Sequence, residues 1–275
     1  MSLPTPPALY YLRLREARMI SVVACVKNRA HNVKKWLESL ALQTVDIQTI
    51  LVDYGSDDGL DKVLEDSPIA VGYVPVEDLG IDKFPEAYLK NVGIRHANED
   101  IVACTNVDVC YEPEFFEKLA RKLDKHTLVM AMRKNAPQDT DVPVDVEGWG
   151  RDRKGQDGKP AWSVTIVWGP DTGLPIIAAA DLQMLHRADW YGLQGYDEEI
   201  TGWGSLDSDL TMRCLLYGMN LHIAGMDYAT YVHEWHESYP EVHLQDAARN
   251  HPVIMDKINC GSVRRNGKTW GGSDA

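Results

Sequence analysis

Short apolar runs alternate with amphipathic stretches along the first part of the chain. Residues 20–26 form an apolar, β-branched run that is typical of a strand covered on both faces. The next apolar side chains recur at helical spacing after Asn32, which is the expected helix cap. This alternation predicts successive βαβ units, and therefore a largely parallel sheet between helices. The other predicted strands are 48–52, 70–75 and 100–105, and the other predicted helices begin at residue 60 and cover 84–97 and 113–123.

A change of composition marks the middle of the chain. Residues 134–162 are rich in glycine, proline, aspartate and lysine, which predicts a long mobile loop. Such a loop is either a substrate lid or a disordered surface insertion, and both interpretations stay open. Residues 163–168 and 175–180 are strand-like, and 209–218 are helix-like. The predicted organisation is an N-terminal tail at 1–18, an α/β half at 19–133, the loop, a second half of the same domain at 163–260 and a C-terminal tail at 261–275.

Charge and cysteine content narrow the class of protein. The chain of 275 residues carries 41 acidic and 28 basic residues, and its net charge of −13 argues against nonspecific binding to nucleic acid or to an anionic membrane. No apolar run reaches the length of a membrane span, so we expect no transmembrane segment and a cytoplasmic location, with peripheral membrane attachment left open. The five cysteines lack CxxC spacing, which argues against a structural zinc site and a disulfide framework.

Polar side chains gather where the predicted parallel strands end. Asn28 and Arg29 follow the first strand, Asp53 and Asp58 the second, and 106–108 the fourth. Parallel sheets bind ligands beyond the carboxyl ends of their strands, so these residues are candidates for a common site. Alternation along an extended segment places positions 106 and 108 on one face.

Residues 193–210 (LQGYDEEITGWGSLDSDL) combine a turn of small residues with an aromatic side chain and two acids. Glycines allow a backbone to approach a ligand closely, and Trp203 offers a flat apolar wall suited to a sugar ring. Asp207 follows at once, as a general base or metal ligand would. Asp209 is better interpreted as the cap of the following helix. The segment therefore predicts an enzyme that acts on a polar, sugar-like substrate.

Four segments, in order, resemble a known family. Residues 20–43 (ISVVACVKNRAHNVKKWLESLALQ) are similar to the opening strand and helix of family-2-like glycosyltransferases with the GT-A fold. Residues 51–59 (LVDYGSDDG) resemble their VVDDGSxDGT turn, and 89–109 (LKNVGIRHANEDIVACTNVDV) their ARNxGxxxAxGxxxxxLDxD segment. Residues 193–210 resemble the GGFDExxxGWGxEDxDL block of galactosyltransferase-type C-terminal regions. The resemblance implies an α/β protein of GT-A type, with a Rossmann-like, mostly parallel central sheet flanked by helices and a C-terminal acceptor-binding elaboration.

The resemblance also implies a nucleotide-diphosphate-sugar donor, either a UDP- or a GDP-sugar. Asp53 would accept a hydrogen bond from the base and Asp58 would shape the base pocket, with Asn28, Arg29 and Asn106 in the same donor-binding set. An alternative for Asp53 is a turn residue that satisfies local amides.

A divalent cation, Mn²⁺ or Mg²⁺, is implied by the same resemblance. Residues 106–108 occupy the place of the family's DxD motif, in which a cation bridges the donor phosphates. Asn106 departs from the pattern because its amide brings no charge, so Asp108 is the expected ligand. His233 is the first candidate for a further ligand and His236 the second. The alternatives are a polar strand terminus at 106–108 and histidines that are merely hydrogen-bonded.

Asp207 aligns with the general base of inverting relatives, which removes a proton from the acceptor hydroxyl. Leu206 stands where the family has glutamate. Trp203 and Gly204 are expected to contact donor or acceptor sugar, although a core tryptophan is the alternative. The resemblance therefore predicts a glycosyltransferase that acts on a carbohydrate or other hydroxyl acceptor.

Three other functions remain open. A retaining glycosyltransferase has the same fold and similar segments. A sugar-nucleotide nucleotidyltransferase would need a glycine-rich, basic phosphate loop after the first strand, and residues 27–32 contain no glycine. A noncatalytic nucleotide- or sugar-binding relative is favoured by Asn106 and Leu206, and fold-level analogy does not exclude it.

Overall fold

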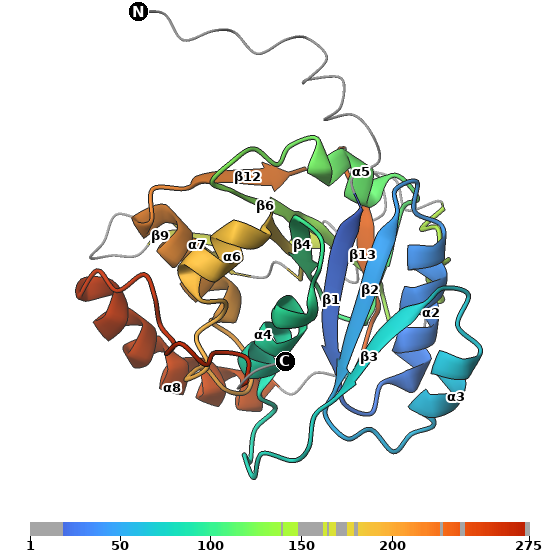
Figure 1. The fold of residues 1–275 in the computed structure, drawn as a ribbon, viewed down its shortest axis with the longest axis horizontal. Coiled ribbons are helices and arrows are strands. Elements are labelled where there is room, and N and C mark those ends of the chain that lie inside the picture. The colour runs from blue at the N-terminus through green and yellow to red at the C-terminus, as the bar shows by residue number, and fades with distance from the viewer. Residues whose placement is uncertain are drawn as a thin grey trace, which may run out of the picture.

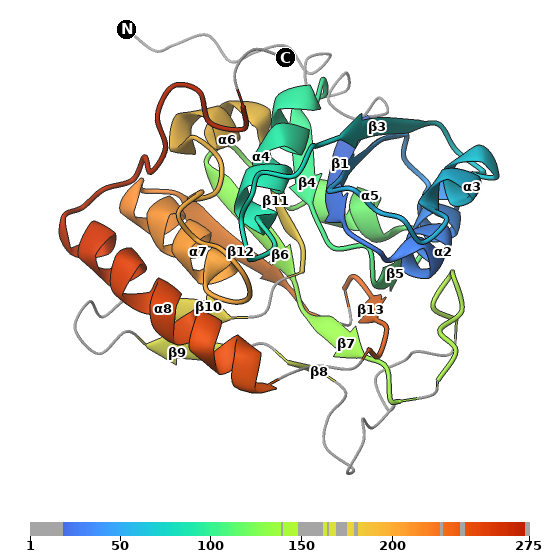
Figure 2. The same ribbon diagram turned by 90° about the horizontal axis from the view of Figure 1, so that it is seen from below.

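A seven-stranded sheet with helices on both faces forms the centre of the computed structural model (Figures 1 and 2). Its strand order is β12-β6-β11-β4-β1-β2-β3, and β11 runs antiparallel to both of its neighbours while the other pairs are parallel. This arrangement confirms the predicted mostly parallel α/β sheet. The strands are β1 (Ile20–Val26), β2 (Ile47–Asp53), β3 (Val71–Pro75), β4 (Ile101–Cys104), β6 (Thr127–Ala131), β11 (Gln183–His186) and β12 (Asn220–Ala224). The structure describes residues 19–138, 140–147, 162–163, 165–168, 175–178, 181–225, 228–236 and 240–272.

Two apolar layers, one on each face of the sheet, explain the apolar runs of the central strands. Along β1, Val23 and Cys25 pack into one layer while Val22 and Ala24 pack into the other. Because successive side chains of a strand point to opposite faces, a strand buried on both faces is apolar throughout. The first layer lies under α4 (Glu86–His96), α6 (Arg187–Leu193), α7 (Leu206–Leu216) and α8 (Pro240–Asn259), and the second under α2 (Ala30–Ala41), α3 (Leu60–Glu65) and α5 (Phe115–Ala120).

A smaller sheet, in the order β5-β13-β7-β8, carries residues of the candidate site. Strand β13 pairs antiparallel with β5 and parallel with β7. Cys110 and Val232 of this sheet form a small core with Ala136, Val142 and Val146. The strands are β5 (Val109–Tyr111), β7 (Arg133–Asn135), β8 (Trp162–Ser163) and β13 (Tyr231–His233), and a separate two-stranded sheet pairs β9 (Thr165–Trp168) with β10 (Pro175–Ala178).

The long segment predicted as a mobile loop begins in ordered structure. Strand β7 and residues 136–138 and 140–147 are described, and Val142 and Val146 in them are buried. Residues 139 and 148–161 lie outside the described residues, so the choice between a lid and an insertion stays a prediction. Within the predicted C-terminal tail, Trp270 is buried at 4% exposure. The predicted N-terminal tail, 1–18, lies outside the described residues.

Two predicted helix caps are wrong, and for a similar reason. Helix α2 begins at Ala30, so Asn32 lies inside it, and its amide donates a hydrogen bond to Glu234 at 2.8 Å. Helix α7 begins at Leu206, so Asp209 also lies inside a helix, where it is fully buried and pairs with Arg213 at 2.7 Å. In both cases the helix begins earlier than predicted and a side-chain partner takes the polar group: the distant Glu234 for Asn32, and Arg213, one helical turn further on, for Asp209. None of the helices in the described ranges combines the length and apolar composition needed to cross a bilayer.

Candidate active site

Asp108, His233 and His236 form a cluster at the carboxyl edge of the main sheet. Asp108 lies between β4 and β5, while His233 is the last residue of β13. The Nε2 atoms of His233 and His236 lie 3.5 and 3.3 Å from Asp108 Oδ2. One ligand atom from each of the three residues lies within 4.8 Å of the other two. The structure therefore brings together the three residues predicted to bind metal.

The electrostatics of this cluster suit a cation. Burial would raise the pKa of Asp108, but the charge of His233 and hydrogen bonds from both histidines hold that pKa well below its ordinary value. Burial would lower the pKa of His233, and Asp108 reverses this and raises it. Asp108 Oδ1 is buried and has no hydrogen-bond partner among the described residues. An ionised carboxylate with an unused buried oxygen is costly unless a ligand completes it, so these residues fit a divalent cation.

Glu234 holds the histidine segment in place. Its backbone N–H donates to the carbonyl oxygen of Asp108 at 2.8 Å. Its carboxylate accepts hydrogen bonds from Asn32 at 2.8 Å and from Lys35 at 2.9 Å, both on α2. Helix α2 therefore anchors the short segment between the two histidines. The sequence contains one signal for this role, an acid between the two candidate ligands, but its partners lie about 200 residues away in the chain.

Asn106 is adjacent to this cluster but belongs to another network. Its side-chain oxygen accepts a hydrogen bond from Lys90 at 3.2 Å, and its Nδ2 donates to Asp181 at 3.3 Å. Lys90 is buried at 3% exposure and pairs with Glu86 at 2.6 Å. Burial would lower the pKa of Lys90, but Glu86 and, to a lesser extent, Asp207 raise it. Lys90 thus links the position of the expected first metal-binding acid to the candidate base.

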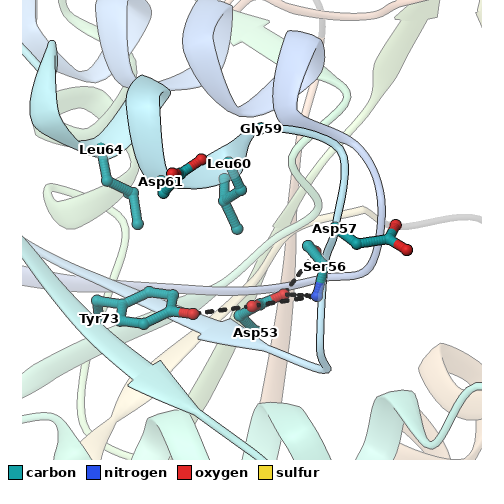
Figure 3. A pocket seen from close by; sticks show the side chains of 8 residues that line it. All are labelled: Asp53, Ser56, Asp57, Gly59, Leu60, Asp61, Leu64 and Tyr73. Carbon is teal, nitrogen blue, oxygen red and sulfur yellow. Dashed lines mark hydrogen bonds between the residues drawn. The ribbon is translucent and has the colours of Figure 1, made fainter.

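Asp53 faces a cavity of about 540 Å³ between β2, β3 and α3 (Figure 3). Its carboxylate accepts hydrogen bonds from the Ser56 hydroxyl at 2.5 Å and from Tyr73 at 2.9 Å. The lining includes Asp57 and Asp61 and, in the described part of the chain, no lysine or arginine. A pocket with this charge suits a neutral group such as a base or a sugar hydroxyl better than a phosphate.

Asn28 and Asp58, two further residues predicted for the donor site, form hydrogen bonds between the loop after β1 and the loop after β2. Asn28 Oδ1 accepts the N–H of Asp57 at 2.8 Å, and its own N–H donates to Ser56 Oγ at 2.9 Å. Asp58 accepts the N–H of Ala30, the first residue of α2, at 2.8 Å. Arg29 is the cap residue of that helix and is half-buried. These contacts shape the loops beside Asp53.

The turn before α7 has the backbone that its glycines predict. Gly202, Gly204 and Ser205 all have positive φ, at 72°, 85° and 74°. Trp203 is 53% exposed, so the alternative of a core tryptophan is wrong. Asp207 follows in the first turn of α7, and its carbonyl oxygen accepts a hydrogen bond from Gln183 on β11. The turn therefore presents an exposed aromatic ring a few residues before the candidate base.

Helix α8 holds this turn, a contact that the sequence pattern did not reveal. Asp246 accepts the N–H of Trp203 at 3.0 Å, and a Cβ at Gly202 would lie 2.4 Å from the same carboxylate oxygen. Asn250 donates to the carbonyl oxygens of Thr201 and Gly204, each at 3.2 Å. Burial would raise the pKa of Asp246, but the Trp203 N–H and Lys83 lower it. Glycine at 202 is therefore required by both its φ and its close packing.

Two family models match the chain. Residues 21–174 match the glycosyl transferase family 2 model, and residues 181–237 match the model described as the N-terminal domain of galactosyltransferase. Helix α8 lies beyond both matches. Curated relatives include two proteins named validoxylamine A glucosyltransferase. The one from Streptomyces hygroscopicus subsp. jinggangensis (strain 5008) is 24% identical over 87% of this chain and 63% of its own length, and the one from subsp. limoneus is 23% identical over 87% and 58%. The chain thus spans about six-tenths of the length of these relatives.

Solved structures share the fold at low sequence identity. TarS residues 1–349 from S. aureus, in complex with UDP, match with a TM-score of 0.57 at 16% identity, covering 86% of this chain and 65% of that one. GalNAc-T7, solved with UDP, GalNAc and Mn²⁺, matches with a TM-score of 0.59 at 13% identity, covering 84% and 48%. These likenesses confirm the GT-A fold expected from the sequence.

Proposed function

The chain belongs to glycosyl transferase family 2, and from this premise we propose that it transfers a sugar from a nucleotide-diphosphate donor to a hydroxyl acceptor with the help of a divalent cation. The observation that carries the proposal is the cluster of Asp108, His233 and His236, with an unpartnered oxygen on an ionised carboxylate. It lies at the edge where parallel strands present ligand-binding residues.

Asp108, His233 and His236 would hold the cation. When bound, the cation neutralises negative charge that builds on the departing nucleotide diphosphate. Two imidazoles beside one carboxylate favour Mn²⁺ over Mg²⁺, because Mg²⁺ strongly prefers oxygen ligands. The Mn²⁺ recorded with GalNAc-T7 supports the same choice.

Asp207 would act as the general base of an inverting transfer. A carboxylate in that role removes the proton of the acceptor hydroxyl as the hydroxyl attacks the anomeric carbon. Trp203 and Gly204 belong to the acceptor side, where the exposed ring offers an apolar surface to a sugar. Leu206 brings no second acid, so Asp207 carries the proton transfer without a neighbouring carboxylate in sequence.

The donor nucleotide would bind over residues 19–133, and the acceptor over residues 163–260. The Asp53 carboxylate already accepts the N–H and the hydroxyl of Ser56 and the hydroxyl of Tyr73, so a base N–H would displace or share one of these donors. Asn28, Arg29 and Asp58 would support this pocket, and Asn106, two residues after β4, would belong to the same donor-binding set. Because both solved structures contain UDP, a UDP-sugar is the first donor to test. Because both curated relatives are named glucosyltransferases, UDP-glucose is the first UDP-sugar to test.

A thermal-shift panel tests the proposed function. The full chain is heated with UDP, GDP, UDP-glucose and GDP-glucose, each with and without Mn²⁺. A ligand that binds the folded state raises the unfolding temperature. We expect the largest rise with UDP-glucose plus Mn²⁺, followed by release of UDP when an acceptor panel is added. No shift with any nucleotide in the presence of Mn²⁺ would contradict the proposal.

A noncatalytic nucleotide-binding relative is the second candidate, favoured by the loss of acids at Asn106 and Leu206. It predicts the same thermal shifts but no UDP release, whether to water or to a broad acceptor panel. Even slow release of UDP from UDP-glucose to water would exclude a noncatalytic protein.

A further inference from the structure

We infer that Asp181 supplies, from the neighbouring strand, the negative charge that Asn106 fails to bring to the cation site. This inference rests on the proposed divalent cation. Asp181 would act through a water molecule bound to the cation rather than as a direct ligand, because it is not among the three residues whose ligand atoms lie together. Asp181 is thus a positioning residue for the cation and its water shell.

The strand register brings Asp181 to Asn106. Strand β11 runs antiparallel to β4, with Gln183 opposite Cys104. Two residues further, the same register places Asp181 opposite Asn106. The hydrogen bond of 3.3 Å from Asn106 Nδ2 to Asp181 Oδ1 agrees with this placement. The acid that is absent two residues after β4 is therefore present two residues before β11, the strand beside it.

The second oxygen of Asp181 is available for a ligand. Oδ1 accepts hydrogen bonds from both Asn106 and Arg133, the latter at 2.7 Å. Oδ2 is buried and lacks a hydrogen-bond partner in the ranges that the structure describes. Asp181 as a residue is only 7% exposed. Asp108 Oδ1 is buried and unpartnered in the same way, so two carboxylates of this edge each leave one oxygen unused.

Both partners of Asp181 belong to segments that also carry the metal cluster. Asn106, which binds Asp181, lies two residues before Asp108 in the chain. Arg133, the second partner of Asp181 at 2.7 Å, is the first residue of β7, and β7 pairs with the strand that ends in His233. Asn106 thus has a use that aspartate at 106 would lack: its amide N–H binds the Asp181 carboxylate, whereas two carboxylates at this spacing would repel each other.

A charge-swap series measured by Mn²⁺ titration calorimetry on the full chain tests the inference. The loss of an outer partner typically costs roughly 10–100-fold in metal affinity, so we expect Asp181→Asn to weaken Mn²⁺ binding about tenfold or more. The double variant Asn106→Asp/Asp181→Asn restores one acid and one amide, and we expect affinity within about threefold of wild type.

Two controls separate the charge on the cation from the packing around it. Asp189→Asn removes another buried carboxylate, which pairs with His126, and should leave Mn²⁺ affinity unchanged. Arg133→Gln/Asp181→Asn removes both partners of the ion pair. If Asp181 acts on the cation, this double variant stays at least about fivefold weaker than wild type, whereas a purely structural role for Asp181 predicts recovery.

The inference and the proposed function fail in different ways. Wild-type affinity in Asp181→Asn, or a double variant Asn106→Asp/Asp181→Asn that binds Mn²⁺ no more tightly than Asp181→Asn, would overturn the inference and leave the proposed cation site standing. Absence of Mn²⁺ binding by the wild-type chain would remove the cation site itself, and the inference with it.

Discussion

The ends of strands β2 and β4 carry acids from two family-like segments, and the protein uses these acids differently. At the end of β2, Asp53 accepts hydrogen bonds from Ser56 and Tyr73, and Asp58 accepts a backbone N–H of α2. After β4, Asp108 has one oxygen near two histidines and the other buried without a partner in the described structure.

This difference distinguishes acids that stabilise a loop from acids that bind a ligand. A carboxylate that protein donors already satisfy stabilises the loop that contains it, while a buried oxygen without a donor gains most from a ligand. Sequence motifs do not distinguish the two cases, because both kinds of acid occur in the same type of strand-end turn. The predictions below test this separation, in descending order of effect.

The largest effect is expected for Asp207→Asn, which lies outside both regions and isolates chemistry from binding. General base catalysis contributes roughly 10²–10⁴-fold, so release of nucleoside diphosphate should fall by about a thousandfold. Mn²⁺ and UDP affinities should stay unchanged because neither proposed binding region includes Asp207. Single-turnover kinetics and calorimetry measure the two properties. Glu65→Gln, an exposed carboxylate on α3, is the control, and wild-type turnover in Asp207→Asn would remove the base assignment.

His233→Ala should weaken Mn²⁺ binding more than His236→Ala does. Both imidazoles lie near Asp108 Oδ2, but the His233 side chain is 14% exposed against 29% for His236, so water replaces it less well. We expect the loss of Mn²⁺ affinity in His233→Ala to exceed the roughly 10–100-fold cost of removing an outer partner. Calorimetry with Mn²⁺ gives the comparison, and equal affinity in His233→Ala and wild type would exclude His233 as a ligand.

Asp53→Asn and Asp58→Ala should change different properties, although both residues lie at the end of β2: the first should change UDP affinity and the second the stability of the fold. If Asp53 accepts a base N–H, its loss should weaken UDP binding about tenfold, the size of one hydrogen bond to a charged group. Asp58→Ala should lower the free energy of unfolding by about 1 kcal/mol, because a helix N–H loses its acceptor, with UDP affinity within about twofold. Calorimetry and urea unfolding measure the two effects. Unchanged UDP affinity in Asp53→Asn together with weakened UDP binding in Asp58→Ala would contradict these two roles.

The smallest effect is a pH-dependent change in stability, and it concerns the contact between α8 and the turn before α7. Because the folded-state pKa of Asp246 lies below the ordinary value of 3.8, its stabilisation is fully present above that pH and is lost as pH falls through the lowered pKa. Asp246→Asn should therefore lower the free energy of unfolding by about 0.5–1 kcal/mol at pH 7 and by less near pH 3. Urea unfolding at both pH values is the measurement, and exposed Asp256→Asn on the same helix is the control. A pH-independent difference would contradict this role.

Local patterning predicted the first half of the fold well. The apolar run of β1 and the helical spacing of α2 are local signals, and both elements lie within a few residues of their expected bounds. Strands β6, β11 and β12 were not predicted, although they complete the main sheet. Strand β6 is a short apolar run, which periodicity alone does not separate from a buried helix segment, whereas β11 and β12 are short and contain polar residues.

The candidate site was predictable only as far as its chemistry is local. Asp108 and Asp207 lie within family-like segments, and His233 follows an apolar run. Asp181 and Asp246 are different, since their partners Asn106 and Trp203 lie 75 and 43 residues away. Such contacts follow from strand register and helix packing, which periodicity does not encode. Asp209 is a different case, because its partner Arg213 lies four residues further on the same helix, and the wrong prediction of a cap followed from placing the start of α7 three residues too late.

The central claim is that Asp108 and the two histidines hold a divalent cation that supports donor binding. Its most direct test is Mn²⁺ titration of the wild-type chain and of Asp108→Asn, each with and without UDP. The account predicts one Mn²⁺ site in the wild type, tighter binding of UDP when Mn²⁺ is present, and loss of both properties in Asp108→Asn. Equal Mn²⁺ affinity in the two proteins, or UDP binding that is indifferent to Mn²⁺ in the wild type, would contradict it.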